Sequence, residues 1–225
     1  MGLFRKVLTL NLGKFLDSLD DCLVLIRKAT LEDLPGLYNV CLKTGDSGND
    51  ATAIYKNINI LGEIYVGPYV AFDSDSSFAL IDDEGKISGY ALSTLDTVTF
   101  QETCAKHWWP KIQSKYSEPE KNLESSWTPE NFLEYEIFHP TPSPTEVLDK
   151  YPSHGHIDLL PHMQGKGWGK KMMNEVDKAL IARGSPGMHL RVSHVNFRAL
   201  GFYDKLGYPE IMKRGNEVIV GKRYL

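Results

Sequence analysis

One stretch of the chain, from His156 to Lys171, constrains the fold more than any other. An apolar strand-like run ends at Pro161, glycines follow at the alternate positions 165, 167 and 169, and residues with helical apolar spacing come next. A tight turn from strand to helix leaves backbone N–H groups unpaired, and they converge at the positive end of the helix dipole. Such a concavity suits a phosphate or diphosphate. The stretch therefore predicts an α/β fold with an anionic cofactor bound at this junction.

The spacing of the glycines excludes two common phosphate loops. The nucleotide P-loop requires Gly-x-x-x-x-Gly-Lys-Ser/Thr, which is absent here. The dinucleotide fingerprint requires a glycine at position 170, which is occupied by Lys170. The pattern that remains is Gln-x-x-Gly-x-Gly, formed by Gln164, Gly167 and Gly169.

Hydrophobic periodicity predicts the order of the other elements. Thr30 is a helix N-cap with Asp33 three residues on, and the Asp- and Gly-rich turn at 82–85 joins a hairpin. Asn196 caps the last helix, which Gly207 ends. The predicted strands are 23–26, 78–81, 87–95, 156–160, 188–192, one at 211 and 218–220; the predicted helices are 30–42, a weak one over 54–61, 170–183 and 196–206.

The segment 97–153 differs in amino-acid composition from the rest of the chain. It contains three of the four tryptophans, and between Tyr116 and Asp149 eight acidic residues stand against one basic residue, Lys121. An aromatic-rich stretch of this length without a repeat is typical of a partly helical insertion that packs on the fold. We expect its tryptophans to pack rather than to bind, and its acidity to favour a cationic partner.

Length and charge limit the remaining function classes. The 225 residues and 42% hydrophobic content suit one soluble domain, and the net charge of −4 gives no general attraction to nucleic acid or anionic membrane. No apolar run is long enough to span a bilayer. Three cysteines without a C-x-x-C pair favour a reducing compartment, so the expected localisation is cytoplasmic, with the nucleus open for a eukaryote.

The domain boundaries follow from the same reading. Residues 1–22 are expected to be an N-terminal extension, and residues 23–225 to form the domain. Arg5, Lys6 and Lys14 without an acid before Phe15 leave three alternatives open: an amphipathic helix packed on the domain, a linker remnant, or an organellar signal.

The glycine loop resembles the coenzyme A diphosphate loop of the GNAT acetyltransferases. A second motif, from Asn196 through Ala199, Phe202 and Tyr203 to Gly207 and Tyr208, is similar to that superfamily's Asn-x-x-Ala-x-x-Phe-Tyr-x-x-x-Gly-Phe helix. The resemblance implies a GNAT fold, a mixed and mostly antiparallel sheet flanked by helices, with the long insertion between the third and fourth strands. It also implies acetyl-CoA as cofactor and an amine as acceptor, for example a lysine-bearing protein or peptide or a polyamine.

A narrower resemblance is to the acetyltransferase-like domain of animal protein O-GlcNAcases and its bacterial relatives. It is carried by Asp82 to Gly85, Gly89 to Leu92, Ser185 to Gly187 and Phe202 to Gly207. The mammalian form of that domain has a degraded glycine loop, whereas the loop here is intact. The resemblance implies that the chain belongs to a larger O-GlcNAcase-like protein, and it leaves two functions open: an acetyltransferase, or an inactive relative that serves as a binding or scaffold module.

The site residues divide into two groups. Tyr203 stands where the GNAT family places a phenol beside the departing sulfur, and Asp158 is the acid best placed to deprotonate an acceptor, with His154 and His156 on its strand face. The backbone N–H of Leu159 or Leu160 is the expected oxyanion donor. The expected cofactor-binding residues are Leu159, Leu160, Gln164, Gly165, Lys166, Gly167, Trp168, Gly169, Lys170, Asn196 and Tyr203, with Lys171 also near the phosphates.

A metal site is the alternative to a cofactor-binding loop, and it would indicate a different class of enzyme. His156 and Asp158, with His189 or His194 further on, imitate the two-histidine, one-carboxylate triad of non-haem iron enzymes. The pattern is short and lies on a strand that leads into a phosphate-type loop, so no metal is expected.

Overall fold

A computed structural model describes residues 24–224 and contains a seven-stranded sheet in the order β1-β2-β3-β4-β5-β7-β6. Every neighbouring pair is antiparallel except β4 and β5, which are parallel. This mixed, mostly antiparallel sheet flanked by helices confirms the predicted fold class. The strands are β1 Leu25–Lys28, β2 Phe78–Ile81, β3 Ile87–Thr94, β4 Ser153–Leu159, β5 Gly187–Ser193, β6 Glu210–Arg214 and β7 Glu217–Arg223.

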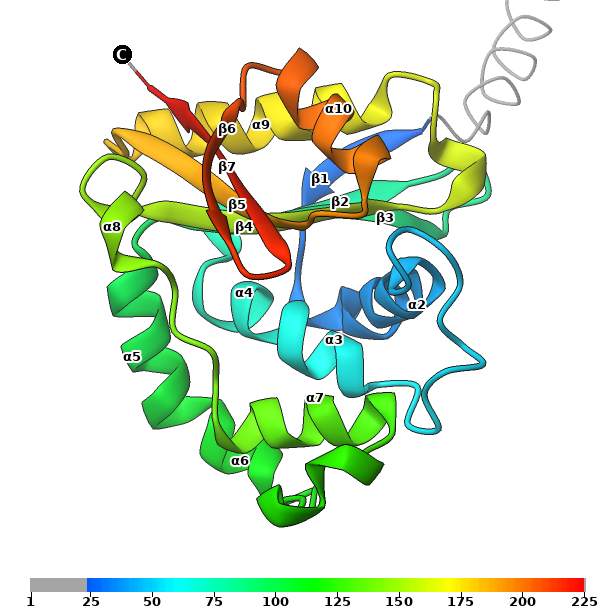
Figure 1. The fold of residues 1–225 in the computed structure, drawn as a ribbon. Helices are drawn as coiled ribbons and strands as arrows, with labels where there is room; N and C mark the ends of the chain where they lie inside the picture. Colours follow the sequence, from blue (N-terminus) through cyan, green and yellow to red (C-terminus); the bar gives the residue numbers. More distant parts are fainter. Residues whose placement is uncertain (1–23, 225) are drawn as a thin grey trace, which may run out of the picture.

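The helices cover both faces of the sheet (Figure 1). Helices α9 and α10 lie on one face, and α2, α3 and α4 lie on the other, with α5 to α7 beyond them. The α-helices are α2 Leu34–Thr44, α3 Ile60–Tyr65, α4 Gly67–Phe72, α5 Thr97–His107, α6 Trp109–Gln113, α7 Pro129–Phe138, α8 Thr145–Leu148, α9 Trp168–Ala182 and α10 Phe197–Lys205; short 3-10 turns lie at Leu31–Asp33, Ser74–Ser76, Lys121–Ser126 and Pro161–Met163.

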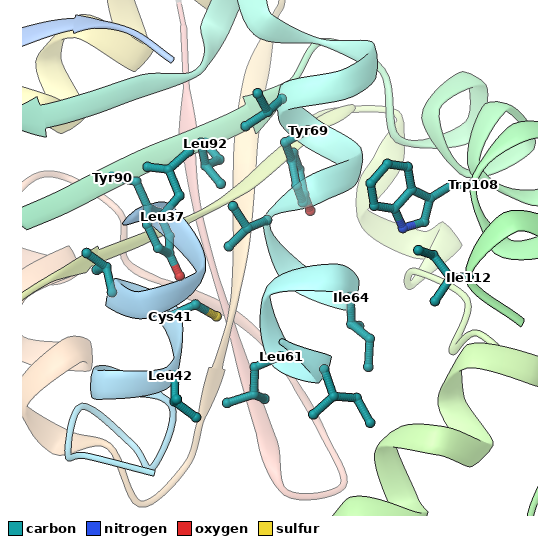
Figure 2. Close-up of a cluster of buried hydrophobic side chains, with 14 of the residues drawn as sticks. Leu37, Cys41, Leu42, Leu61, Ile64, Tyr69, Tyr90, Leu92, Trp108 and Ile112 are labelled. Atoms are coloured by element: carbon teal, nitrogen blue, oxygen red, sulfur yellow. The ribbon is translucent and has the colours of Figure 1, made fainter. Parts of the chain in front are cut away.

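Alternation along the strands builds a separate core on each face. On β3, Tyr90 and Leu92 pack with α2 to α4, whereas Ala91 packs with the residues under α9 and α10. Figure 2 shows part of the first core, in which Tyr90 and Leu92 of the sheet lie near Leu37 and Cys41 of α2. The same alternation directs successive side chains of β4 to opposite faces of the sheet.

Local signals in the sequence position most element ends. Thr30 N–H donates to Asp33 Oδ2 at 2.8 Å, which is the reciprocal bond of a capping box at the predicted helix start. Asp82 accepts the N–H groups of Glu84 and Lys86 at 3.0 and 2.9 Å, which holds the predicted hairpin turn. Both features are confirmed because they depend only on residues a few positions apart.

Two predicted elements were misplaced. The first strand begins at Leu25 and includes Arg27 and Lys28, because it pairs at the edge of the sheet with residues 78–81 of β2. An edge strand with exposed positions does not need the continuous apolar run that the prediction followed. The weak helix over 54–61 is also wrong: Ile54 and Ile58 are exposed, and the helix starts at Ile60.

The insertion between β3 and β4 is partly helical, as predicted, and it closes on itself. Thr97 N–H donates to Pro152 O at 2.8 Å, so the two ends of the insertion meet. Trp108 is buried and its indole N–H donates to Glu63 O at 2.8 Å, which ties the insertion to α3. Trp108 thus packs, as expected; it lies beside Ile112 in Figure 2.

The division of the chain at residue 22 stays a prediction. The expected N-terminal extension and its three alternative interpretations lie outside the described residues, as does Cys22. Cys41 and Cys104 are buried free thiols, and burial raises the pKa of each to about 12.

Candidate active site

The site is a cleft of about 620 Å³ at the point where β4 and β5 separate. These two strands pair only through Ser153 with Met188 and His154 with His189, and then diverge. The carboxyl end of β4, the glycine loop, β5 and α10 all contribute to its walls. The cleft therefore joins the two faces of the sheet at its centre.

The glycine loop has the conformation that its sequence requires. Gly165 and Gly167 have φ angles of 71° and 83°, in the left-handed region that favours glycine. A Cβ atom added at either position would meet nothing within 4 Å, so the loop faces open space. Lys171 N–H makes the first bond of α9, to Gly167 O at 3.1 Å. The N–H groups of the three preceding residues have no helical acceptor and are free for an anion, with Lys170 at the cleft wall.

Arg198 connects three walls of the cleft, although the sequence reasoning did not select it. Its Nη1 donates to Gln164 Oε1 at 2.8 Å, and Gln164 Nε2 donates to Leu159 O at 2.7 Å. A Cβ atom on Gly48 would lie 2.4 Å from Arg198 Nη2, so the loop after α2 meets the same guanidinium. The side chain of Gln164 therefore positions the loop. The only signal for Arg198 was its place inside the Asn-x-x-Ala motif.

Strand pairing separates the two candidate oxyanion donors. Leu160 N–H donates to Ser88 O on β3 at 2.9 Å, which takes it out of the cleft and corrects the inclusion of Leu160 as a candidate. Backbone groups alternate in direction along a strand, so Leu159 N–H points away from β3, toward the gap left by β5. Leu159 also lines the cleft, and it stays a candidate.

Asp158 lies on the side of the sheet that faces α2, where it accepts a hydrogen bond from Tyr90 Oη at 2.6 Å. Tyr90 is its partner in the β3–β4 register, so strand pairing itself sets the contact. Burial raises the pKa of Asp158 to about 6, against the opposing effects of the Tyr90 hydrogen bond and the Arg198 charge. At pH 7 the carboxylate is mostly ionised and can still accept a proton.

Tyr203 lies on the opposite side of the sheet, in the core beneath α9 and α10. It is 7% exposed and lines the cleft. Burial, with the charge of Asp158, raises the pKa of its phenol above its ordinary value. The hydroxyl therefore stays protonated at neutral pH and is available as a hydrogen-bond donor. Asp158 and Tyr203 thus flank the gap between β4 and β5 from opposite sides.

The histidines that share the face of Asp158 are neutral. His154 contacts Thr97 Oγ1 through Nδ1 at 2.7 Å, and His156 lies edge-on to Tyr69 with ring centroids 5.3 Å apart. Burial lowers the pKa of His156 to about 4 and that of His154 well below its ordinary value. His156 lines the cleft together with Arg191 of β5.

The structure brings most of the expected cofactor residues together. Asn196 lines the cleft and caps α10 by accepting Ala199 N–H at 3.1 Å. Lys166 and Trp168 are not among the lining residues, and Lys171 lies over the Trp168 ring at 3.8 Å. The side chains of Trp168 and Lys171 are thus engaged with each other, and the expected contact of these two residues with the cofactor stays a prediction. The two residues are three positions apart on α9, a spacing at which helical side chains meet, and Trp168 also packs against the core beneath α9 and α10.

The rival metal site does not form in the described residues. No three His, Cys, Asp or Glu side chains among residues 24–224 gather closely enough to hold a metal ion. His189 Nδ1–H donates to Tyr151 O at 2.7 Å, and His194 Nδ1–H donates to Asn216 O at 2.8 Å, so each is directed elsewhere. Among the same residues there is also no helix with the length and apolarity that a membrane span requires.

Comparison with known proteins agrees with this geometry. The model of the acetyltransferase (GNAT) family matches residues 49–208. The protein O-GlcNAcases of Rattus norvegicus and Mus musculus are each 31% identical to the chain over 190 residues, or 84% of it. The chain spans only 20% of the length of these relatives, so the match concerns one part of a larger protein.

Two solved structures describe the similarity of fold. The crystal structure of SsHAT is 29% identical, covers 89% of this chain and 98% of its own, and superposes with a TM-score of 0.81. An N-acetyltransferase from Thermoplasma acidophilum, solved in complex with coenzyme A, is 15% identical with a TM-score of 0.52, covering 89% of this chain and 99% of its own. The second likeness concerns the fold alone.

Proposed function

The chain belongs to the GNAT acetyltransferase family, and on that premise we propose that it transfers the acetyl group of acetyl-CoA to an amine acceptor. The observation that carries the proposal is the cleft itself, in which a proton acceptor and a phenol flank the gap between two diverging strands. Coenzyme A binding and acetyl-CoA turnover are two separate measurements.

The residues at the glycine loop fit a diphosphate. Open space at Gly165 and Gly167, free N–H groups at the start of α9, and the ammonium of Lys170 supply room and positive potential. Asn196 and the loop would hold the cofactor at the mouth of the cleft. When bound, acetyl-CoA supplies a thioester carbonyl that an amine can attack.

The chain's own groups divide the remaining work. Leu159 N–H would stabilise negative charge that develops on the carbonyl oxygen. Asp158 would accept the proton of the incoming amine, directly or through a water molecule. A lysine-type amine with a pKa near 10.4 needs such help, because the cost of losing its proton is about 4–5 kcal/mol at pH 7. Tyr203 would donate a hydrogen bond to the departing thiolate from the other side of the sheet.

Replacement of Tyr203 by phenylalanine tests the proposal. Tyr203→Phe removes one hydroxyl, so we expect kcat to fall by about 10²-fold or more while the affinity for coenzyme A changes little. Turnover of acetyl-CoA with a panel of amines and calorimetric titration with coenzyme A would measure the two quantities separately.

Tyr135→Phe is the matched control, since Tyr135 stacks on His139 in the insertion and does not line the cleft. Equal rates in the parent and the Tyr203→Phe variant would remove the assigned role of the phenol. Coenzyme A binding without turnover for any amine would instead identify the chain as a binding or scaffold module with a retained cofactor cleft.

A further inference from the structure

A hydroxyl group lies deep in the apolar core between the sheet and α2. Tyr90 of β3 is fully buried, and its ring lies near Leu37 and Cys41 in Figure 2. A buried hydroxyl costs free energy unless it is hydrogen-bonded, and phenylalanine would fill almost the same volume without that cost. The Tyr90 hydroxyl donates to Asp158 Oδ2 at 2.6 Å. The polar atom in this core is therefore directed at the carboxylate that lines the cleft.

The hydrogen bond has one direction at neutral pH. Burial raises the pKa of the Tyr90 phenol well above its ordinary value, so the phenol keeps its proton. The thiol of Cys41, which also hydrogen-bonds to Tyr90, has a pKa raised to about 12 by burial and is protonated too. Since an ionised carboxylate only accepts, the phenol proton points to Asp158 and the thiol can donate to the phenol oxygen.

The backbone of the sheet holds both partners in place. Tyr90 and Asp158 stand directly opposite each other in the register of β3 and β4, where the pairing fixes the separation of their side chains. Asp158 lines the cleft, and Tyr90 lies behind it in the core. The Oδ2 atom is therefore occupied on the core side, and Oδ1 is the oxygen available to a group in the cleft.

The charged and titratable groups near Asp158 do not orient its carboxylate. Arg198 of α10 contributes a positive charge that favours the ionised form, but its Nη1 donates to the glycine loop. Arg191 of β5 is bound to Glu217, which accepts from its Nε and Nη2 at 3.0 and 2.9 Å. His156, on the same strand face, is neutral because burial lowers its pKa to about 4.

Two other hydroxyl groups lie near the same carboxylate, and both are directed elsewhere. Thr44 of α2 lies beside Asp158, but its hydroxyl donates to Val40 O at 2.8 Å. Tyr203 packs on the opposite side of the sheet. The phenol of Tyr90 thus holds the carboxylate from the side of α2.

We infer that Tyr90 is a positioning residue for the proposed transfer: it fixes the Asp158 carboxylate with Oδ1 toward the acceptor and favours its ionised form. The inference rests on the proposed function for the role of Asp158 as the base. Tyr90 touches neither the cofactor nor the amine and acts through Asp158. Without its hydroxyl, the carboxyl group would bind its proton more tightly, because a hydrogen bond to the charged form is lost.

The test replaces Tyr90 by phenylalanine and follows the proton of Asp158 directly. Carbon-13 NMR of protein labelled at the aspartate carboxyls would give its titration midpoint, with the signal assigned by its loss in Asp158→Asn. We expect a midpoint near pH 6 in the parent and a midpoint about one pH unit higher in Tyr90→Phe. The lower limb of the pH dependence of kcat should move by the same amount, so that kcat falls about fivefold at pH 6 and little at pH 8.

Tyr208→Phe is the matched control. Tyr208 is also fully buried and its hydroxyl donates to Asp177, which accepts from Lys222 Nζ at 2.7 Å as well. The control should leave the Asp158 midpoint and the pH dependence of kcat unchanged, even if it lowers stability. Calorimetric titration with coenzyme A would show that both variants are folded.

A measurement on the parent needs no variant at Tyr90. A fully buried hydroxyl proton exchanges slowly with water and can be observed by proton NMR. The resonance of the Tyr90 hydroxyl should change with the same midpoint as the Asp158 carboxyl, because protonation of the carboxylate weakens the bond between them.

The outcomes separate this inference from the proposed function. An Asp158 midpoint that is unchanged in Tyr90→Phe, or that moves equally in Tyr208→Phe, overturns the inference and leaves acetyl transfer standing. A hydroxyl resonance that does not follow the carboxyl titration overturns it as well. A midpoint raised only in Tyr90→Phe, without turnover in the parent for any amine, supports the control of Asp158 by Tyr90 and refutes acetyl transfer.

Discussion

At the scale of single residues, two aspartates of the same intrinsic acidity have different pKa values because their surroundings differ. Asp158 has a pKa raised to about 6 by burial, whereas the pKa of Asp33 is lowered to about 2 by its hydrogen bonds from Arg27. One carboxyl group can therefore accept a proton near neutral pH, and the other is a fixed anion in a helix cap. The alternation of strand residues placed Asp158, but its raised proton affinity comes from burial in the surrounding core, which outweighs the opposing hydrogen bond from Tyr90.

The raised pKa of Asp158 predicts a conflict between stability and activity. A folded-state pKa above the unfolded value penalises the folded state as pH rises from about 4 through 6, and the penalty is complete above that range. We expect Asp158→Asn to stabilise the protein by about 3 kcal/mol at pH 7 and to change stability little near pH 4. Urea denaturation at both pH values would measure this.

The same variant should lose most of its turnover, because an amide cannot accept the amine's proton. If Asp158→Asn is less stable than the parent at pH 7, the carboxylate is held by attractive contacts stronger than its burial cost. The assignment as a base would then lose its support.

At the scale of elements, the glycine loop and α9 form one unit. The left-handed φ of Gly167 is needed so that the chain can enter α9 with its N–H groups toward the cleft. Gly169 has another function: a Cβ atom there would lie 3.1 Å from the ring of Phe202, so glycine lets α9 approach α10 closely. The requirement at Gly167 is local to the motif, whereas the one at Gly169 depends on contact with a distant helix.

The loop gives a test in which charge alone is varied. Gly167→Asn and Gly167→Asp should each destabilise by about 1 kcal/mol, because both place a side chain in the left-handed region, which Asn and Asp tolerate similarly. Only aspartate adds a negative charge beside the N–H groups. We expect Gly167→Asp to bind coenzyme A at least about tenfold more weakly than Gly167→Asn, since like charges repel.

Calorimetry with coenzyme A, and thermal melting as a control for folding, would measure the difference. Equal affinities in the two variants would place the diphosphate elsewhere.

At the scale of the whole molecule, the insertion and the sheet bury a set of neutral histidines. His154, His156 and His189 lie on one face near the point where β4 and β5 separate, and burial lowers the pKa of each. His189 is fully buried, and its Nε2 has no hydrogen-bond partner among the described residues. Protonation of any of the three would place a charge inside the core.

This cluster predicts acid sensitivity. A histidine with a depressed folded-state pKa binds a proton more weakly when folded, so stability falls as pH drops below about 6.5. His156 has a pKa lowered to about 4, so its reluctance to bind a proton should lower the free energy of unfolding by at most about 2 kcal/mol between pH 7 and pH 5. Protonation of Asp158 over the same range partly offsets this loss. Urea denaturation at the two pH values would measure the loss.

His156→Gln should reduce the loss, whereas His107→Gln, at an exposed position on α5, should leave it unchanged. A stability that is the same at pH 5 and pH 7, or a loss unaffected by His156→Gln, would contradict the prediction.

The sequence by itself determined the parts of this protein that depend on neighbours along the chain. The hairpin turn at Asp82, the left-handed glycines and the Asn196 cap are fixed by φ preferences and hydrogen bonds within a few residues. Together with the resemblance of the two motifs, these signals were sufficient for the fold class, the family and the location of the glycine loop.

Only the tertiary structure decided how distant segments complete the site. Pairing with β3 takes Leu160 N–H out of the cleft and sets Tyr90 against Asp158, and Arg198 joins the glycine loop to Gly48. The physical reason is that strand pairing and burial depend on residues far apart in the chain, whereas hydrophobic periodicity reflects only neighbouring residues. The same packing sets which buried groups hold their protons at neutral pH.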